Sequence, residues 1–229
     1  MPDVDNSAFK LYKIQLSSFY NQICNLKKNL TTSELERAER YHFTKDKHRF
    51  IICRSFLKLI LSEHTGLKTS ELTLEKDAHK KPFLSSHASV FFNVAHSAEY
   101  GLIAIGNSPI GVDVEKVNHD WDYSVTAPFI FGKSEINKLA NADDKISLFF
   151  KYWTRKEAIV KATGKGIDEN FIEIPACDGM HALKPSFLNN HSKVVVLTFE
   201  FDEHFFGSIA FTGNHQNISY LKFSPLPHY

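Results

Sequence analysis

The sequence has few cysteines, and no pattern that would pair them or use them to hold a metal. Of its 229 residues only three are cysteine (Cys24, Cys53 and Cys177), and they form no CxxC pair. This odd, widely spaced set argues against a disulfide framework and against a cysteine-based zinc site, and it suits a reducing compartment. We therefore expect a cytoplasmic protein.

Long apolar runs and a targeting segment are also missing. No apolar stretch approaches the length of a membrane span, and residues 1–5 lack the basic and apolar regions of a signal peptide. The formal net charge is only +1, from 27 basic and 26 acidic residues. We therefore expect neither a membrane nor a nucleic acid as the main partner.

Several common catalytic signatures are absent as well. The sequence has no H-E-x-x-H or H-x-x-x-H zinc pattern and no G-x-S-x-G nucleophile elbow, and Gly164-Lys165-Gly166 lacks Walker A spacing. Histidine-based zinc chemistry, serine hydrolysis and P-loop binding are therefore not expected. His96 ends an apolar strand, where a structural hydrogen-bonding role and a ligand-binding role both remain open.

The hydrophobic pattern of the first half predicts helices followed by strands. Ser33 and Glu36 have the spacing of a capping box, and Gly66 is placed to end the second helix. The Gly106-Asn107 turn signal predicts that the last two strands form a hairpin. Helices are predicted at residues 33–41 and 45–63, and strands at 9–16, 72–74, 90–95, 101–105 and 110–114.

The second half repeats this order, so the sequence predicts an α+β protein with antiparallel strands. We divide the chain into halves at 1–106 and 107–229, with a crossing between them near Val117–Trp121. Helices are predicted from near residue 134 and at 145–163, and strands at 194–201, 206–211 and 218–223. Nine basic residues lie between Lys27 and Lys58 against four acidic ones. This excess fits either solvated helix faces or a local site for phosphate groups.

Asp113 and Glu115 alternate with apolar residues in the predicted strand that begins at Ile110. Residues two apart in a strand point to the same face, about 6–7 Å from each other. Taken alone, the pair suits the solvated side of an edge strand. It also suits a Mg²⁺ site, because Mg²⁺ prefers oxygen ligands and takes few of them from protein.

Glu157 and Lys161 lie four residues apart in the long predicted helix, on one face of it. An ordinary surface ion pair is the simplest interpretation. However, Phe149, Phe150 and Trp153 make much of this helix apolar. The pair is therefore expected at the edge of a core rather than in open water.

Two of these stretches, read together, identify a family. Gly111–Glu115 (GVDVE) and Trp153–Lys161 (WTRKEAIVK) closely resemble the signature of 4′-phosphopantetheinyl transferases of the larger, pseudo-dimeric Sfp type. Weaker matches at Lys45–Arg49, Lys81-Pro82 and Asn93–Ser97 follow the family's order, so the resemblance covers most of residues 35–170. It implies two similar halves, each with helices packed on a small antiparallel sheet.

The resemblance implies an enzyme that transfers 4′-phosphopantetheine from coenzyme A to a serine of an apo acyl or peptidyl carrier protein, releasing adenosine 3′,5′-bisphosphate. It implies Mg²⁺ as cofactor, coenzyme A as co-substrate and a monomer that serves fatty-acid, polyketide or nonribosomal peptide synthesis. Residues 1–106 would form the nucleotide side and 107–229 would carry the metal-binding and catalytic motifs. Two alternatives stay open: another Mg²⁺-dependent phosphotransferase or phosphohydrolase, and a non-catalytic module that binds coenzyme A or carrier proteins.

The resemblance also implies roles for individual residues. Asp113, Glu115 and Glu157 would bind Mg²⁺, Lys161 would contact phosphate, and Glu157 is our candidate for the base that accepts the serine proton. Glu157 and Lys161 are thus the expected catalytic pair. The residues expected to bind coenzyme A are Arg37, Arg49, Lys81, Pro82, His96, Ser97 and Lys161.

The sequence departs from the family pattern at two positions. Ala95 stands where the family usually has Ser, and Lys80 stands where Gly commonly precedes Lys-Pro. Neither residue belongs to the predicted metal site, so altered coenzyme A affinity is expected rather than lost catalysis. Phe129–Lys133 is a candidate docking segment for an acidic carrier protein, although its aromatic residues also suit a buried core.

Overall fold

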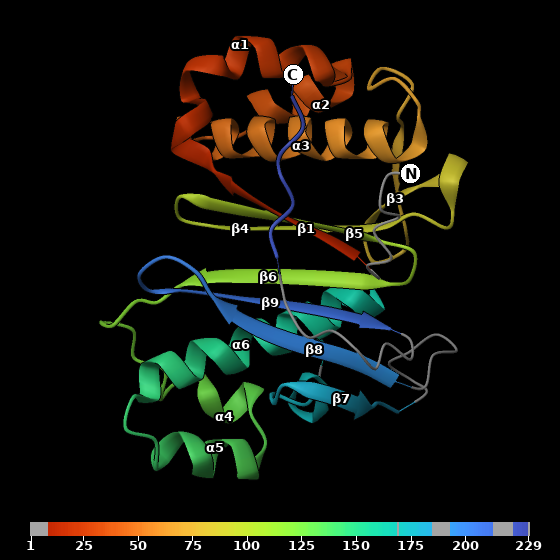
Figure 1. Cartoon of the computed structure of the whole chain (residues 1–229). Coiled ribbons are helices and arrows are strands. Elements are labelled where there is room, and N and C mark those ends of the chain that lie inside the picture. Colours follow the sequence, from red (N-terminus) through yellow and green to blue (C-terminus); the bar gives the residue numbers. More distant parts are fainter. Residues whose placement is uncertain (1–8, 169, 185–192, 213–221, 229) are drawn as a thin grey trace.

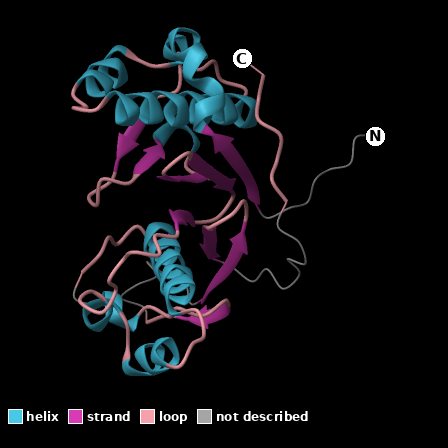
Figure 2. Ribbon diagram, turned by 90° about the vertical axis from the view of Figure 1, so that its left-hand side faces the viewer, coloured by secondary structure: helices cyan, strands magenta, loops and turns pink. Residues whose placement is uncertain are grey.

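Two antiparallel sheets pack face to face, and helices cover the outer face of each sheet (Figures 1 and 2). The computed structural model describes residues 9–168, 170–184, 193–212 and 222–228. Side chains from both sheets, such as Leu102 and Val112, form the apolar layer between them. The α+β class and the arrangement in two similar halves, predicted from the sequence, are confirmed.

The first sheet has the strand order β1-β5-β4, with every neighbour antiparallel. A two-stranded hairpin, β2-β3, lies beside it. The elements of this half are β1 (Phe9–Gln15), α1 (Ile23–Leu26), α2 (Thr32–Glu39), α3 (Thr44–Thr65), β2 (Leu74–Lys76), β3 (Pro82–Leu84), β4 (Phe91–Ser97) and β5 (Tyr100–Gly106), with 3-10 turns at Leu16–Gln22, Lys27–Asn29 and Ser85–His87.

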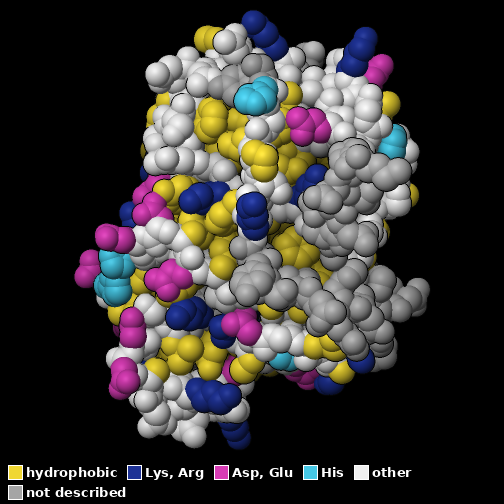
Figure 3. Space-filling view, in the orientation of Figure 1, with side chains coloured by type: hydrophobic (Ala, Val, Ile, Leu, Met, Phe, Trp, Pro, Cys, Tyr) yellow, Lys and Arg dark blue, Asp and Glu magenta, His cyan; other side chains and the backbone are white. Residues whose placement is uncertain are grey.

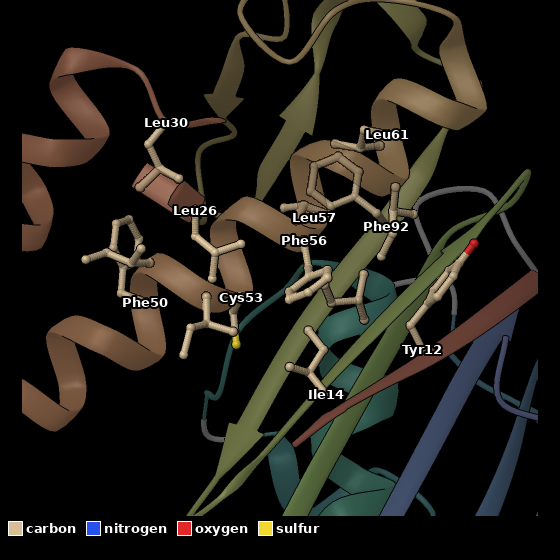
Figure 4. Close-up of a cluster of buried hydrophobic side chains, with 14 of the residues drawn as sticks. Tyr12, Ile14, Leu26, Leu30, Phe50, Cys53, Phe56, Leu57, Leu61 and Phe92 are labelled. Atoms are coloured by element: carbon tan, nitrogen blue, oxygen red, sulfur yellow. The ribbon is translucent and has the colours of Figure 1, made fainter. Parts of the chain in front are cut away.

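Helix α3 covers the first sheet with a broad apolar face. Phe56 and Leu57 of this helix lie among Ile14 of β1 and Phe92 of β4 (Figure 4). These four side chains are almost fully buried, so the hydrophobic effect holds the helix on the sheet. The helix ends at Gly66, whose positive φ of 76° closes it as predicted.

The capping box of α2 differs from the predicted one. Thr31 is the N-cap: its hydroxyl accepts from the Glu34 N–H at 3.3 Å, and the Glu34 carboxylate accepts from the Thr31 N–H at 2.9 Å. Ser33 and Glu36, the predicted pair, lie inside the helix. The error arose because the TTSELE stretch offers two overlapping capping registers, and the structure uses the earlier one.

The second sheet has the strand order β6-β9-β8-β7, again antiparallel throughout. The long helix α6 packs across its outer face, and α4 and α5 lie beyond that helix (Figure 1). The elements are β6 (Ile110–Lys116), α4 (Ala127–Ile130), α5 (Lys133–Ala140), α6 (Lys145–Thr163), β7 (Gly179–Ala182), β8 (Lys193–Glu200) and β9 (Phe205–Thr212), with a 3-10 turn at Phe171–Glu173.

The predicted hairpin between β5 and β6 is wrong. Strand β5 pairs with β1 and β4, whereas β6 pairs with β9, so the two strands belong to different sheets. The chain therefore passes between the sheets at residues 107–109 rather than near Val117–Trp121. Every residue of β5 is buried. A strand at the centre of a sheet that is covered on both faces is buried in this way, whereas a strand of an exposed hairpin is not.

Other boundaries differ by small amounts. The short strand predicted at 72–74 lies at 74–76, and the pattern gave no sign of β3 or β7. The strand predicted at 218–223 falls largely outside the described residues; of its residues only 222 and 223 are described, and Phe223 forms an isolated parallel bridge to Leu11. Within the part of the chain that the structure describes, no helix is long and apolar enough to cross a membrane.

Candidate active site

The site begins where strand β6 meets helix α6. Gly111, Asp113 and Glu115 face this helix, while the alternate side chains of β6 point into the layer between the sheets. A Cβ on Gly111 would lie only 2.1 Å from the Ala158 carbonyl oxygen and 2.3 Å from the Ala162 nitrogen. Glycine at this position therefore lets helix and strand approach closely enough for their side chains to meet.

Asp113 and Glu157 share the ammonium group of Lys161. Lys161 Nζ lies 2.6 Å from Asp113 Oδ1 and 4.0 Å from Glu157 Oε2. The second oxygen of each carboxylate, Asp113 Oδ2 and Glu157 Oε1, is buried and has no hydrogen-bond partner among the described residues. A buried carboxylate oxygen without a donor is costly, so these two atoms are available to a cation.

Glu115 completes the cluster from the next outward-facing position of β6. Its Oε2 accepts a hydrogen bond from Ser97 Oγ at 2.8 Å, and the Lys116 N–H donates to the same hydroxyl at 3.1 Å. The Trp153 side chain of α6 favours the charged form of Glu115 and so lowers its pKa, against the larger effect of burial. Ser97, which the resemblance placed with the coenzyme A ligands, therefore orients a carboxylate in this structure.

The pKa values of the cluster are displaced in a consistent direction. Burial raises the pKa of Asp113, against the opposing charge of Lys161. Burial and the neighbouring Asp113 charge raise the pKa of Glu115. Burial raises the pKa of Glu157 to about 7, and the other two carboxylates add to the shift. For Lys161 burial acts in the opposite sense, but Asp113, Glu157 and Glu115 together outweigh it and raise the pKa of the ammonium.

A pocket of about 350 Å³ lies on the α3 side of the first sheet. Of the residues predicted to bind coenzyme A, Arg37, Pro82 and His96 line it. The Arg37 guanidinium lies 4.8 Å from the centre of the Phe50 ring, which is also in the wall. The other lining residues are Tyr41, Cys53, Arg54, Leu57, Lys76, Lys80, Asn93 and Val94.

Three cations of this pocket, Arg54, Lys76 and Lys80, were not among the predicted ligands. Only Arg54 fell within the basic 27–58 stretch, which was the one sequence signal for it. On the face shown in Figure 3, Lys and Arg side chains are interspersed with Asp and Glu, and neither sign forms a continuous patch. The cations of the pocket are thus a local feature that suits a small anionic ligand.

Arg49 and Lys81 lie outside the wall of this pocket. Arg49 Nη1 pairs with Asp46 at 3.1 Å, and its Nε is buried without a partner among the described residues. Lys81 Nζ donates to backbone carbonyls, and the side chain lines a separate pocket of about 470 Å³. Ala95 packs in the layer between the sheets, so a serine hydroxyl there would start from the core side of β4.

Lys156, for which the sequence predicted no role, is fully buried. Lys156 Nζ pairs with Glu135 at 3.1 Å and donates to the carbonyls of Ile130 at 2.8 Å and Ile172 at 3.1 Å. It ties α4 and the 171–173 turn to the helix that carries Glu157. The candidate docking segment Phe129–Lys133 is partly exposed and partly buried: Phe129 is 79% exposed, whereas Phe131 is fully buried.

The donor set fits a hard divalent cation in chemistry but is not closed around one. Within the described residues no group of three or more His, Cys, Asp or Glu is close enough to form a metal site. The Lys161 ammonium lies against Asp113 and within 4.0 Å of Glu157. Oxygen ligands and the two orphaned oxygens match the preference of Mg²⁺, which takes its remaining ligands from phosphates and water.

Comparison with known proteins assigns the family. The model described as the 4′-phosphopantetheinyl transferase superfamily matches residues 109–210, and one described as 4′-phosphopantetheinyl transferase, N-terminal, matches 17–108. The chain belongs to the 4′-phosphopantetheinyl transferase superfamily. It is accordingly a transferase that moves the phosphopantetheine group of coenzyme A to a carrier protein.

Individual relatives agree with this assignment. The 4′-phosphopantetheinyl transferase HetI of Nostoc sp. is 32% identical over 163 residues, 69% of either chain. The 4′-phosphopantetheinyl transferase psf-1 of Bacillus pumilus is 28% identical over 203 residues, 84% of this chain and 85% of its own. The 4′-phosphopantetheinyl transferase Sfp of Bacillus subtilis is 24% identical over 178 residues, 76% and 78% of the two chains.

Proposed function

We propose that Asp113, Glu115, Glu157 and Lys161 form the catalytic centre of the phosphopantetheine transfer. One observation carries the proposal: the Asp113 and Glu157 carboxylates flank the Lys161 ammonium, Glu115 lies near enough to raise the pKa of Glu157, and two of the buried oxygens lack partners among the described residues. Carboxylates arranged in this way repel one another, and a bound cation relieves that repulsion. Lys161 alone cannot balance three of them.

Mg²⁺ is the proposed metal, held by Asp113, Glu115 and Glu157. When bound, it would act as a Lewis acid that neutralises charge developing on the coenzyme A pyrophosphate. The Lys161 ammonium, which now pairs with Asp113, would contact the phosphate and stabilise the same charge. Its 28% exposed side chain has access to the open side of the cluster.

The transfer requires a base, because the carrier serine loses a proton as its oxygen bonds to the phosphorus that bears pantetheine. The bond from this phosphorus to the oxygen of adenosine 3′,5′-bisphosphate breaks in the same displacement. Burial raises the pKa of Glu157 to about 7, close to the pH at which a cell operates. Bound Mg²⁺ would lower this pKa, so Glu157 is proposed to accept the serine proton because its carboxylate lies in the cluster where the reaction would occur.

The nucleotide end of coenzyme A is proposed to bind the pocket that Arg37, Pro82 and His96 line, with Arg49 beside it. Residues 1–106 would then form the nucleotide side and 107–229 the metal and catalytic side. His96 lines the pocket, and the next residue of β4, Ser97, donates a hydrogen bond to Glu115. Consecutive residues of β4 therefore contact the two sites. This adjacency supports one ligand spanning both.

The proposed active unit is a monomer in the cytoplasm. A single chain supplies both the pocket and the carboxylate cluster, so a second copy is not needed to complete the site. All three cysteines are free thiols, in keeping with a reducing compartment. The exposed Phe129 beside buried Phe131 makes 129–133 the proposed contact region for an acidic carrier domain.

The direct test is mass spectrometry of a panel of apo carrier proteins incubated with coenzyme A and MgCl₂. The expected result is the mass of one phosphopantetheine added at the carrier serine, lost with EDTA and in the Asp113→Asn and Glu157→Gln variants. Glu173→Gln, which changes an exposed carboxylate paired with Lys184, is the matched control and should keep activity. Full activity of both site variants would refute the proposed centre. If the protein binds coenzyme A or a carrier protein but no carrier of the panel gains mass, a non-catalytic binding module is favoured.

A further inference from the structure

The ammonium group of Lys81 donates hydrogen bonds to backbone carbonyls of the other half of the molecule. Its Nζ donates to the carbonyl oxygen of Ile110 at 3.2 Å, to that of Ala162 at 3.4 Å, and to that of Lys161 more closely still. An ammonium group has three N–H donors, so these three acceptors use all of them. The ammonium is therefore already engaged with the backbone when no phosphate is bound.

The three acceptors belong to β6 and α6, the two elements that carry the candidate site. Two are among the last carbonyls of α6, which have no partner within the helix. The third belongs to the first residue of β6, directly before Gly111. One side chain therefore joins the end of the helix that carries Glu157 and Lys161 to the start of the strand that carries Asp113. A positive charge also suits the negative end of a helix dipole.

The backbone of Lys81 is fixed just as firmly as its side chain. Asp77 Oδ1 accepts from the Lys81 N–H at 2.8 Å and from the His79 N–H at 2.9 Å, and the Asp77 N–H donates to the Lys81 carbonyl at 3.0 Å. A Cβ on Gly164 would lie 3.7 Å from both Asp77 Oδ2 and Lys81 Cδ. The β2–β3 turn thus packs directly on the end of α6.

The same hairpin forms part of the nucleotide pocket. Lys76, Lys80 and Pro82, which flank the turn, all line that pocket. The hairpin therefore makes two kinds of contact. The residues on either side of its turn line the pocket, and Lys81 is hydrogen-bonded to the end of α6. Movement of the hairpin would be transmitted to the helix through Lys81.

We propose that Lys81 is a positioning residue that clamps α6 to β6 across the two halves, and is not a ligand of coenzyme A phosphate. This rests on the proposed function, since the clamp matters only if the β6–α6 cluster performs the transfer. Misplacement of reacting groups by about 1 Å can cost about 10²-fold in rate, so loss of the clamp is expected to appear in kcat.

The test compares Lys81→Met with Lys80→Ala, which removes an exposed ammonium from the pocket wall one residue earlier. Steady-state kinetics use coenzyme A and dephospho-coenzyme A, which lacks the 3′-phosphate. For Lys81→Met we expect kcat to fall about 10–100-fold, equally with both substrates, and KM to change less than about three-fold. For Lys80→Ala we expect the reverse: a higher KM for coenzyme A and an unchanged kcat.

Hydrogen exchange supplies a readout that does not depend on catalysis. In Lys81→Met without any ligand, the amides of residues 160–164 should exchange faster than in the wild type, because the last turn of α6 loses its anchor. If Lys81→Met does not fold, Lys81→Arg is measured instead; its guanidinium can still donate to the carbonyls and should preserve the exchange rates. Failure of the catalytic proposal would leave this exchange result untouched.

A single outcome overturns the clamp. In that outcome Lys81→Met has a higher KM than the wild type with coenzyme A but the same KM with dephospho-coenzyme A. Its kcat and the hydrogen exchange of α6 are those of the wild type. That pattern would make Lys81 a phosphate ligand after all.

Discussion

Lys161 Nζ lies 2.6 Å from Asp113 Oδ1, and this contact joins the two motifs that are most informative in the sequence. Asp113 is only 4% exposed, so its charge has little help from water. The ammonium therefore acts as the resident counter-ion of a buried carboxylate. In the helix the expected i,i+4 mate of Lys161 is Glu157, but that pair is wider, at 4.0 Å.

The first prediction follows from this counter-ion role. Lys161→Met should destabilise the metal-free protein by about 3 kcal/mol, since breaking a buried pair leaves an uncompensated charge. Mg²⁺ should restore part of the loss by taking over the compensation, so the rise in Tm on adding MgCl₂ should be larger in the variant than in the wild type. Differential scanning fluorimetry with and without MgCl₂ checks this.

The matched control is Lys184→Met, which breaks an exposed pair with Glu173. Surface pairs contribute about 0–1 kcal/mol, so this variant should keep the wild-type Tm and the wild-type response to Mg²⁺. An equal response to Mg²⁺ in the wild type, in Lys161→Met and in the control would show that Lys161 does not substitute for the metal.

The second prediction concerns pH. Burial raises the pKa of Glu157 to about 7 from its ordinary value of 4.5. Between these two values the folded protein holds a proton that the unfolded chain has released, so the stability contributed by Glu157 falls as the pH rises through this window. Urea unfolding of the metal-free protein from about pH 5 to about pH 7 should therefore give a steeper decline in the wild type than in Glu157→Gln.

The difference between the two proteins isolates Glu157 from Asp113 and Glu115, whose pKa values are raised as well. The same titration predicts that Mg²⁺ binding near pH 6.5 releases a proton, since the metal requires the ionised carboxylate. Calorimetry in two buffers of different ionisation enthalpy measures that release. Identical pH slopes for wild type and Glu157→Gln would mean that another group titrates in this window.

Local periodicity predicted part of this site correctly. The two-residue repeat of β6 placed Asp113 and Glu115 on one face, and the four-residue spacing in α6 did the same for Glu157 and Lys161. Both patterns depend only on the geometry of one strand and one helix. Which carboxylate the lysine prefers depends on how the two elements cross, and no local pattern contains that information.

Long-range relationships account for the errors. The Gly106-Asn107 signal predicts a hairpin, but β5 pairs with β1 and with the preceding β4, whereas β6 pairs with β9, so the two strands enter different sheets. Ser97 of the first sheet reaches Glu115 of the second, and Lys81 reaches a carbonyl eighty residues away. Such contacts follow from tertiary packing, so residue type alone suggested the wrong partner.

Gly111 supports a third prediction. Gly111→Ala should lower stability by about 2–3 kcal/mol and abolish most of the activity, because its Cβ would meet backbone atoms of α6 at 2.1 Å and 2.3 Å. Rigid backbone cannot yield as a side chain does, so the helix must shift away from Asp113. Urea unfolding and the carrier assay measure the two effects.

Gly132→Ala is the control for this substitution. The nearest atoms to a Cβ there lie at 3.9 Å, and its φ of −71° suits alanine. Gly132 is the N-cap of α5, where alanine is less favourable than glycine, so we expect a loss of no more than about 1 kcal/mol and normal activity. Comparable losses in both variants would indicate that the close approach at Gly111 has no special importance.

The last prediction concerns Lys80, where the family commonly has glycine. Its φ of 65° lies in the left-handed region, which costs a non-glycine residue about 1–2 kcal/mol. Glycine removes that cost but adds about 0.5–1 kcal/mol of unfolded-state entropy, so Lys80→Gly should stabilise the protein by about 0.5–1 kcal/mol. Lys80→Ala keeps the left-handed backbone and should not stabilise it. Both variants remove the same pocket cation, so both should raise the KM for coenzyme A to the same extent. Urea unfolding separates the backbone effect from the charge effect, and equal stability of the two variants would show that the turn is not strained.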